Sequence, residues 1–260
     1  MAKEFPYEIK QIAPGIHLIN ESFSTMFVVQ GDTRALIIDC GTGTGDFKSV
    51  IESITSLPYD LVATHAHVDH IGGRGQFSDI FISAADAAKI KSVTPAYRRI
   101  YAVSNKLTGM NKVPLSSVNF TPVKLEPTVH IIGDGYRFDL GGRVLEVLET
   151  PGHTCGSLCL LSKSDGIIFT GDVANEFLFM WMSNCTTVEA VLPTLDRLLS
   201  TDGYETVWAS HTTEPMTRED IVKCRECVAA LSKRKNSVLP FIKMFKQGDS
   251  VIIYRATHIH

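Results

Sequence analysis

Apolar positions in the first part of the chain form short blocks that end at glycine, aspartate or asparagine. The blocks cover residues 15–20, 25–30 and 34–39, and the pair Gly31-Asp32 separates the last two. Short blocks rich in Ile, Val and Leu between turn residues are typical of β-strands. The pattern therefore predicts three consecutive strands in this part of the chain.

Helical and extended patterns then alternate along the rest of the chain. We expect helices over residues 46–56, capped by Asp46, and over 84–91, 95–106, 187–200 and 217–233, with strands at 61–63, 80–83 and 205–210. From Val129 onward, turn residues again separate apolar blocks, which predicts a second sheet. Two halves with strands and helices can stack two sheets face to face with helices outside. We expect one domain over 1–260, with a helical and loop insertion around 86–128.

The side chains that can bind metal are most concentrated in Thr64-His65-Ala66-His67-Val68-Asp69-His70, directly after an apolar run. Histidines two apart on extended chain project to the same side, so His65 and His67 can bind one ion together. A bend at Ile71-Gly72-Gly73 would direct Asp69 and His70 toward a second position. Four ligands packed this closely gain nothing from burial, so we interpret them as part of a two-metal site.

Three further polar residues follow apolar strands. His153 comes after residues 143–148, Asp172 after Ile167-Ile168-Phe169, and His211 after residues 205–210. Function concentrates where strands pass into loops. Each residue alone has an ordinary explanation as a turn or surface residue, but together with the histidine cluster they indicate further metal ligands.

Composition and charge narrow the class of partner. The chain has 260 residues, 44% of them hydrophobic, and a formal net charge of −3. It has no run of basic residues that would bind nucleic acid. No stretch has the length of a membrane span, and the first residues lack an export signal, so we expect a cytoplasmic protein without a membrane partner. The six cysteines are expected to be free buried thiols, including the CxxC pair Cys224 and Cys227.

These motifs resemble those of the metallo-β-lactamase-fold hydrolase superfamily. The likeness rests on Asp39, HAHVDH at 65–70, PGHT at 151–154, TGD at 170–172 and SH at 210–211, in the family's order. It implies a four-layer αβ/βα sandwich. By this resemblance His65, His67 and His153 would bind one metal, Asp69, His70 and His211 the other, and Asp172 both. Asp39 would support the ligands from behind.

The ligand set implies hydrolytic chemistry. Five imidazoles and two carboxylates suit Zn most, with Fe or Mn as alternatives. Two such ions can generate a metal-bound hydroxide that attacks a polarised carbonyl, with Asp69 orienting it or moving its proton. The set is closer to glyoxalase II-like thioesterases and lactonases. We therefore expect a metal-dependent hydrolase that cleaves an ester, thioester, lactone or related acyl bond of a small molecule.

Other functions remain open at this point. A β-lactamase-type amide hydrolase is less favoured because such enzymes generally lack an aspartate at the position of Asp172. A single-iron dioxygenase, or a metal-stabilised binding or sensing protein, would use the same fold. Outside the fold, Ile37-Ile38-Asp39-Cys40-Gly41 and the following glycines resemble the first motif of SAM-dependent methyltransferases, but the next strand ends in Thr64-His65 instead of an acid.

Two segments are expected to wall the substrate pocket. The apolar run at residues 177–182 follows Asp172, and the region from Pro95 to about Lys112 carries aromatic and basic residues. Met and aromatic side chains can receive an apolar substrate, although the run can equally be a core segment. The candidate pocket residues are Phe177, Phe179, Met180, Trp181, Tyr97 and Arg98.

Overall fold

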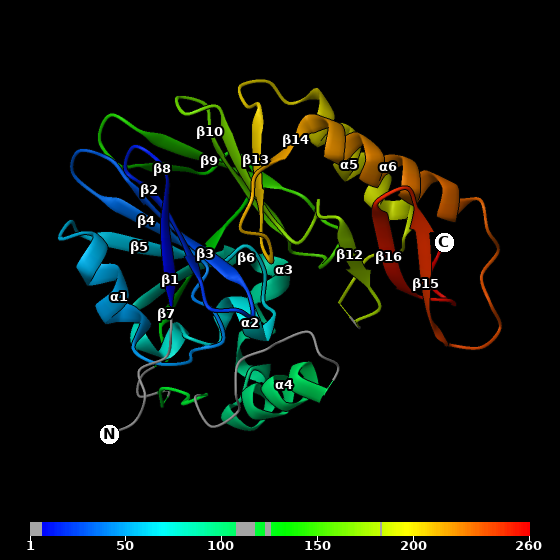
Figure 1. The fold of residues 1–260 in the computed structure, drawn as a ribbon, viewed down its shortest axis with the longest axis horizontal. Coiled ribbons are helices and arrows are strands. Elements are labelled where there is room, and N and C mark those ends of the chain that lie inside the picture. Colours follow the sequence, from blue (N-terminus) through cyan, green and yellow to red (C-terminus); the bar gives the residue numbers. More distant parts are fainter. Residues whose placement is uncertain (1–6, 108–117, 123–125, 183) are drawn as a thin grey trace. The chain divides into compact units, whose positions relative to one another are not determined.

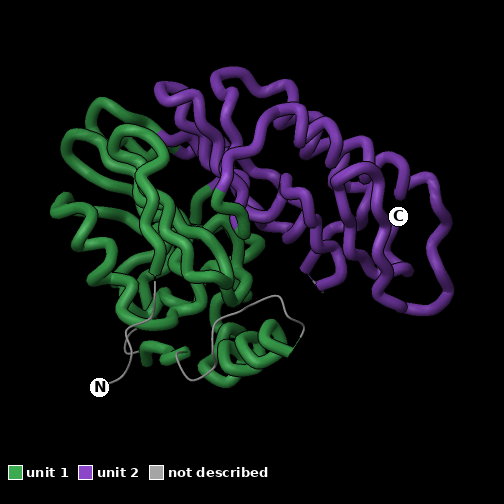
Figure 2. The backbone as a smooth tube through the Cα atoms, in the orientation of Figure 1, with its two compact units in different colours: residues 1–132, 137–144, 211–213 green, residues 133–136, 145–210, 214–260 purple. Residues whose placement is uncertain are grey.

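The computed structural model describes residues 7–107, 118–122, 126–182 and 184–260. The chain forms two compact units (Figure 2). Unit 1 comprises residues 1–132, 137–144 and 211–213, and unit 2 comprises 133–136, 145–210 and 214–260. The single domain over 1–260 stays a prediction. Residues 108–117 and 123–125 of the predicted insertion lie outside the described residues.

In the described part of unit 1, seven strands form one sheet in chain order (Figure 1). The strands are β1 (Glu8–Ala13), β2 (Ile16–Asn20), β3 (Thr25–Gln30), β4 (Ala35–Ile38), β5 (Tyr59–Val62), β6 (Asp79–Ser83) and β7 (Thr128–Ile132). Strands β1 to β4 pair antiparallel and β4 to β7 pair parallel. The predicted strands β2, β3, β4 and β6 are confirmed.

Two features of this sheet differ from the prediction. Strand β1 has largely exposed side chains, so its sequence lacks the apolar alternation that marked the others. Strand β7 was expected to open the second sheet, but it pairs parallel with β6, with Phe81 opposite His130. An apolar block predicts a strand but does not identify its partner. Unit 1 also includes the short strand β8 (Arg137–Asp139).

The helices of unit 1 are short except for α4. They are α1 (Phe47–Ile54), α2 (Val68–Ile71), η1 (Arg74–Gln76), α3 (Ala84–Ala87), η2 (Ile90–Ser92) and α4 (Pro95–Leu107). Asp46 caps α1 as predicted, since its side chain accepts a hydrogen bond from Ser49 N. The expected helix at 84–91 is instead α3 followed by η2, because Lys89 N bonds to Asp86 O and tightens the turn.

The glycine-rich loop at residues 41–45 is folded against its own unit. Gly41, Gly43 and Gly45 have positive φ values of 62°, 80° and 65°. A Cβ on Gly43 would lie 2.5 Å from Nη1 of Arg98 and 2.6 Å from Gly72 O. The glycines therefore provide left-handed backbone and close packing. This role accounts for them without a cofactor and does not favour the methyltransferase hypothesis.

Unit 2 contains two groups of strands and two longer helices. In the larger group the order is β14 (Met216–Thr217), β13 (Thr206–Ala209), β11 (Ile167–Gly171), β10 (Leu158–Ser162) and β9 (Val144–Glu149). A separate sheet has the order β12 (Phe177–Met180), β16 (Ser250–Arg255) and β15 (Ile242–Gln247). Because the sequence analysis placed no element after residue 233, β15 and β16 were not predicted.

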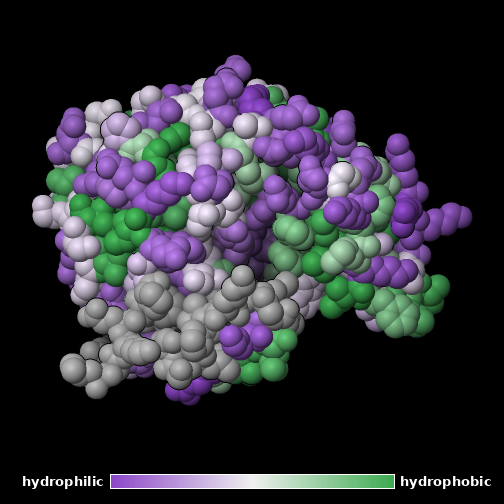
Figure 3. Space-filling view, in the orientation of Figure 1, coloured by the Kyte–Doolittle hydropathy of each residue, from purple (hydrophilic) through white to green (hydrophobic). Residues whose placement is uncertain are grey.

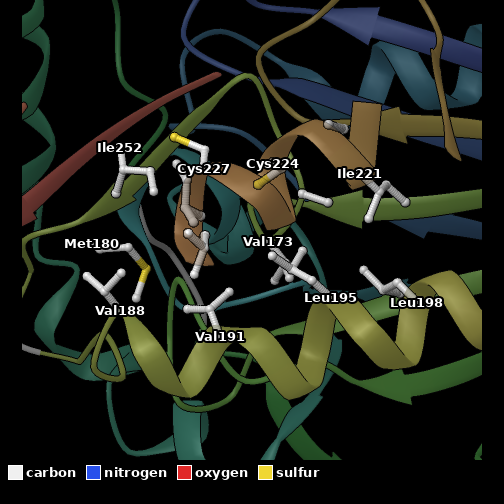
Figure 4. Packing of buried hydrophobic residues seen from close by; sticks show 14 of the residues in the cluster. Val173, Met180, Val188, Val191, Leu195, Leu198, Ile221, Cys224, Cys227 and Ile252 are labelled. Carbon is white, nitrogen blue, oxygen red and sulfur yellow. The ribbon is translucent and has the colours of Figure 1, made fainter. Parts of the chain in front are cut away.

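The helices of unit 2 pack on one another through a buried apolar cluster. Helix α5 (Leu192–Ser200) begins later than expected, after η4 (Glu189–Val191), because Pro193 lies in its first turn. Helix α6 (Arg218–Ser232) starts with a capping box formed by Thr217 and Asp220. Figure 4 shows Leu195 and Leu198 of α5 pointing toward Ile221, Cys224 and Cys227 of α6.

The cysteines behave largely as predicted. All six are free; Cys155 is exposed, contrary to expectation, and the other five are buried. Burial raises the pKa of the Cys224 thiol to about 12, which makes a reactive thiolate unfavourable. The CxxC pair is thus part of the core of unit 2. Among the described residues, no helix has both the length and the apolar character that a bilayer span requires.

A buried carboxyl group supports the glycine-rich loop and makes the stability of the fold depend on pH. Glu21 is fully buried and accepts hydrogen bonds from the Thr42 backbone N–H and hydroxyl. Burial raises the pKa of Glu21 from 4.5 to about 8, although these hydrogen bonds oppose the shift. The folded state therefore holds this proton more tightly than the unfolded state. The contribution to stability is full below the unfolded pKa and is lost as pH rises through the folded pKa.

We predict that Glu21→Gln removes this pH dependence, because the amide makes both hydrogen bonds to Thr42 and does not titrate. Urea denaturation of metal-free protein at about pH 5 and about pH 9 measures the effect. The variant should gain stability over the native chain as pH rises. Glu52→Gln, an exposed change on α1, serves as the control. Equal pH dependence in the Glu21 and Glu52 variants would contradict the prediction.

Candidate metal centre

The histidine motif lies in the loop that follows β5 and in the helix after it. Residues 64–67 form a loop that bends at Thr64 and His65 and not, as expected, the end of a strand. His65 and His67 still lie side by side, with ring centroids 4.6 Å apart. The ring of His70 lies 3.9 Å from that of His65. The bent loop, and not strand alternation, brings these rings together.

Asp69 and His70 lie on the single-turn helix α2, and both are buried. The Oδ2 atom of Asp69 lies 3.7 Å from Nε2 of His70 and 3.4 Å from Nε2 of His211. One ligand atom from each of these three residues lies within 4.8 Å of the other two. Unit 1 therefore brings together the three residues that the resemblance assigned to the second metal.

Asp39 organises this cluster from the end of β4. Its Oδ1 accepts from Thr64 N at 2.7 Å, and its Oδ2 accepts from Thr64 Oγ1 at 2.8 Å and from His70 Nδ1 at 2.7 Å. Asp39 adopts a left-handed φ of 63°, which non-glycine residues rarely adopt outside constrained sites. Its contacts with Thr64 and His70 are those that a residue supporting a ligand would make, and that role stays a prediction for Asp39.

The hydrogen bonds also determine which ring nitrogens of the histidines carry protons. His70 Nδ1 faces a carboxylate, so it donates, and its Nε2 keeps the lone pair. The Thr64 hydroxyl donates to Asp39 and therefore accepts from His65 Nδ1, 3.0 Å away. In both rings Nε2 is the atom available for a metal.

His211 follows β13 and reaches the cluster through unusual backbone geometry. It has a left-handed φ of 68°. Its side chain is partly exposed, in contrast to the buried His70, and the two ring centroids lie 5.6 Å apart. A strained residue at the end of a strand is typical of a functional site.

Unit 2 holds the two remaining predicted ligands next to each other. His153 follows β9, Asp172 follows β11, and His153 Nε2 lies 3.4 Å from Asp172 Oδ2. His153 Nδ1 lies 2.7 Å from the backbone oxygen of Phe179. Since a carbonyl only accepts, Nδ1 carries the proton and Nε2 keeps the lone pair beside the carboxylate.

The chemistry of these donors fits a divalent cation. In each unit a carboxylate oxygen lies 3.4–3.7 Å from imidazole nitrogens, and hydrogen bonds orient two of these rings with Nε2 inward. Lone pairs and a negative charge facing one another repel unless a cation or a proton lies between them. Neutral imidazole with carboxylate is the ligand set of zinc and similar metals.

Two further residues contact the motif and were not predicted in these roles. Tyr101 of α4 donates from its hydroxyl to Asp69 Oδ2 at 2.7 Å. Asp86 of α3 is buried and accepts from Ala66 N at 2.8 Å. Neither Tyr101 nor Asp86 belongs to a sequence motif that indicates a metal site. Only the folded chain shows that their side chains meet the histidine loop.

The predicted pocket residues on α4 separate into two kinds. Arg98 is only 1% exposed and donates to the carbonyl oxygens of Gly72 and Thr121, with its guanidinium over the Phe120 ring. These contacts give Arg98 a structural role and do not favour contact with substrate. Tyr97 is partly exposed; burial and then the Asp69 carboxylate raise its pKa. Its exposed side chain is compatible with a pocket role, which stays a prediction for Tyr97.

The apolar run after Asp172 also separates into two faces. It forms β12, in which Leu178 and Met180 are buried in the core cluster of unit 2. The pocket role predicted for Met180 is thus not favoured, and the alternative core interpretation fits its packing. Phe177 and Phe179 alternate with these residues, and Phe177 and Trp181 are exposed.

We predict that Asp39→Ala lowers the free energy of unfolding by about 3 kcal/mol, because it leaves a buried N–H and a buried imidazole without their acceptor. Urea denaturation of metal-free protein measures the loss. Asp39→Asn should cost less, since asparagine tolerates a left-handed φ and keeps a carbonyl oxygen. Equal stability of the alanine variant and the native chain would show that Asp39 does not hold this cluster.

Known proteins are similar to this chain in sequence. The acyl-coenzyme A thioesterase MBLAC2 from Homo sapiens is 28% identical over 188 residues, covering 65% of this chain and 67% of the relative. The protein of the same name from Gallus gallus is 28% identical over 182 residues, covering 64% of this chain and 65% of its own. The chain thus matches less than two thirds of the Gallus gallus relative.

Solved structures show the same fold. A metallo-beta-lactamase from Pontibacter korlensis superimposes with a TM-score of 0.62 at 19% identity, covering 86% of this chain and 99% of its own. The predicted α/β class and the metallo-β-lactamase fold are thereby confirmed. The sequence profile of the metallo-beta-lactamase superfamily matches residues 19–184, more than half of the chain. The family inferred from the motifs is confirmed: the chain belongs to the metallo-beta-lactamase superfamily.

Proposed function

We propose that this chain is a dinuclear metal-dependent hydrolase that cleaves the acyl bond of a small-molecule thioester, ester or lactone. The observation that carries the proposal is the convergence of Asp69, His70 and His211 in unit 1, with the His70 tautomer set by Asp39. Family membership supports the class of reaction. The thioesterase names of the relatives favour a thioester among the possible substrates.

The proposed ligands are the seven residues of the motifs, and zinc is the preferred metal. One cation would take His65, His67 and His153, and the other Asp69, His70 and His211. Asp172 would serve both. In each unit the orientation of the candidate ligand atoms described above supports this assignment.

The residues around the ligands would prepare the site for hydrolysis. When bound, the metals supply hydroxide at neutral pH and polarise the carbonyl of the substrate. Asp39 and Phe179 O keep His70 and His153 in the tautomer that presents Nε2. Oδ2 of Asp69 accepts from Tyr101 and lies 3.4 Å from His211 Nε2, so Asp69 would be positioned to hold a proton during the reaction.

Two alternatives use the same fold. A β-lactamase-type amide hydrolase would share the metal ligands but cleave a cyclic amide. A single-iron dioxygenase would hold one metal per chain. Metal counting and the identity of the cleaved bond separate these functions from an acyl hydrolase.

We predict that zinc-loaded protein holds two metal ions per chain and hydrolyses acyl thioesters faster than β-lactams or phosphodiesters. Removing the metal with a chelator should abolish turnover and restoring it should recover turnover. Asp172→Ala should reduce both metal content and turnover, because one carboxylate would serve both ions. Metal analysis and release of free thiol are the measurements.

Three results would contradict the proposal. Unchanged metal content in Asp172→Ala would reject the shared carboxylate. One iron per chain with oxygen consumption would favour the dioxygenase. Efficient β-lactam cleavage without thioester cleavage would favour the amide hydrolase.

We predict that Tyr101→Phe lowers kcat for the best substrate roughly tenfold with little change in KM, because partners of metal ligands typically affect activity by about 10–100-fold. The hydroxyl that holds Asp69 Oδ2 is lost while the ring packing on Phe23 is retained. Tyr59→Phe, the same change on β5 away from the motif, is the control. Steady-state kinetics and thermal unfolding are measured together. A kcat equal to that of the native chain would exclude the role of Tyr101.

A further inference from the structure

The three-stranded sheet of unit 2 has one face that does not pack in the core. Phe179 of β12 lies opposite Ile253 of β16, and Ile253 lies opposite Met244 of β15. Directly opposite residues share a face of a sheet, and neighbours along a strand alternate. Leu178, Ile252 and Phe245 form the adjacent row and pack on the core cluster. The row Phe179–Ile253–Met244 therefore faces away from that core.

The outward face is apolar along the row Phe179–Ile253–Met244 and mixed in the rows beside it. By the same alternation it includes Phe177 and Ile242, with Lys246 and Arg255 in the same flanking rows, and Trp181 follows β12 directly. Phe177 is 48% exposed, Ile242 56% and Met244 66%. Figure 3 shows hydrophobic surface at the lower right, where Figure 1 places the loop between α6 and β15. Single exposed apolar side chains are ordinary, but several on one face of a sheet indicate a binding surface.

This face is connected directly to a candidate metal ligand of the same unit. The backbone oxygen of Phe179 accepts the Nδ1 proton of His153 at 2.7 Å, and Nε2 of His153 lies 3.4 Å from Asp172. The strand that orients this ligand thus also carries the first residue of the apolar row. From Phe179 the outward row continues across β16 to Met244 of β15.

The charges around this face favour an anionic ligand with an apolar body. Two cations lie on this face. Lys246 shares it with Met244, and Arg255 lies opposite Ile242 and donates to Trp181 O at 3.1 Å. Lysines along the edge strand β15 disfavour pairing with the same strand of a second copy, since like charges would meet.

We propose that this surface, the acyl face (Phe177, Phe179, Trp181, Ile242, Met244 and Ile253), binds the acyl chain of the substrate and sets the preference for chain length. The inference rests on the proposed acyl hydrolase function and adds the residues that select the substrate. The nearby cations attract the anionic portion of such a ligand.

The test compares acetyl, hexanoyl and dodecanoyl thioesters that share one headgroup. The native chain should show kcat/KM rising with chain length, by up to roughly fourfold for each methylene group buried. In the double variant Met244→Gln/Ile253→Thr the increase should largely vanish, with a loss of at least about tenfold for dodecanoyl and none for acetyl. Glutamine keeps the length of methionine, and threonine keeps β-branching in the strand.

Ile131→Thr is the matched control, because Ile131 is also exposed on a strand but belongs to β7 in unit 1. It should leave the chain-length profile unchanged. A dodecanoyl preference that survives in the double variant overturns the acyl face while leaving the hydrolase proposal intact. A native dimer that dissociates in the double variant, with the chain-length profile unchanged, also overturns it and identifies a subunit interface.

Binding without turnover separates the two proposals. Trp181 is exposed and Trp208 is buried, so dodecanoate added below its micelle concentration should change Trp181 fluorescence. The double variant should bind dodecanoate at least about tenfold more weakly than the native chain. Dodecanoate binding with no thioester hydrolysis supports the acyl face and contradicts the proposed function. Absence of binding to the native chain overturns the acyl face.

Discussion

The candidate metal centre of unit 1 depends on one buried carboxylate. Asp39 accepts three hydrogen bonds from Thr64 and His70, and these bonds connect the end of β4 to the histidine loop and to α2. In the loop after β5 the backbone N–H groups of Thr64 and Ala66 donate to the side chains of Asp39 and Asp86. The left-handed conformation of Asp39 is a local cost, and the buried hydrogen bonds that it permits offset that cost.

In unit 2 a backbone carbonyl, and not a carboxylate, orients the candidate histidine ligand. The carbonyl of Phe179 fixes the His153 ring, and Phe179 lies in a strand whose alternate residues are buried in the core. Packing of Leu178 and Met180 in the core therefore helps to fix the strand that orients His153. The same alternation turns Phe177 and Phe179 outward, so one strand both orients the metal ligand and presents apolar surface.

The sequence indicated the candidate ligands because metal binding requires particular residue types at short spacing. It also predicted β2, β3, β4 and β6 of unit 1, where apolar blocks end at turn residues. It could not identify Tyr101 and Asp86, since neither residue type signals a contact that is made only after folding. Similarly, Arg98 looked like a cation for substrate, although its guanidinium is buried against the carbonyls of Gly72 and Thr121. The pairing of β12 with β16 joins segments about seventy residues apart, which periodicity alone does not reveal.

The arrangement of the ligands also couples metal binding to folding. Asp69, His70 and His211 present like-signed lone pairs to one another at 3.4–3.7 Å in partly or fully buried surroundings. Without a cation, the folded chain is destabilised by this repulsion unless it takes up a proton. The unfolded chain has no such cost, because these groups are then far apart. A cation removes the repulsion only in the folded state, so its binding energy adds to the stability of the fold. Asp39 raises that gain, because it orients His70 before the metal binds and thereby lowers the ordering cost of binding.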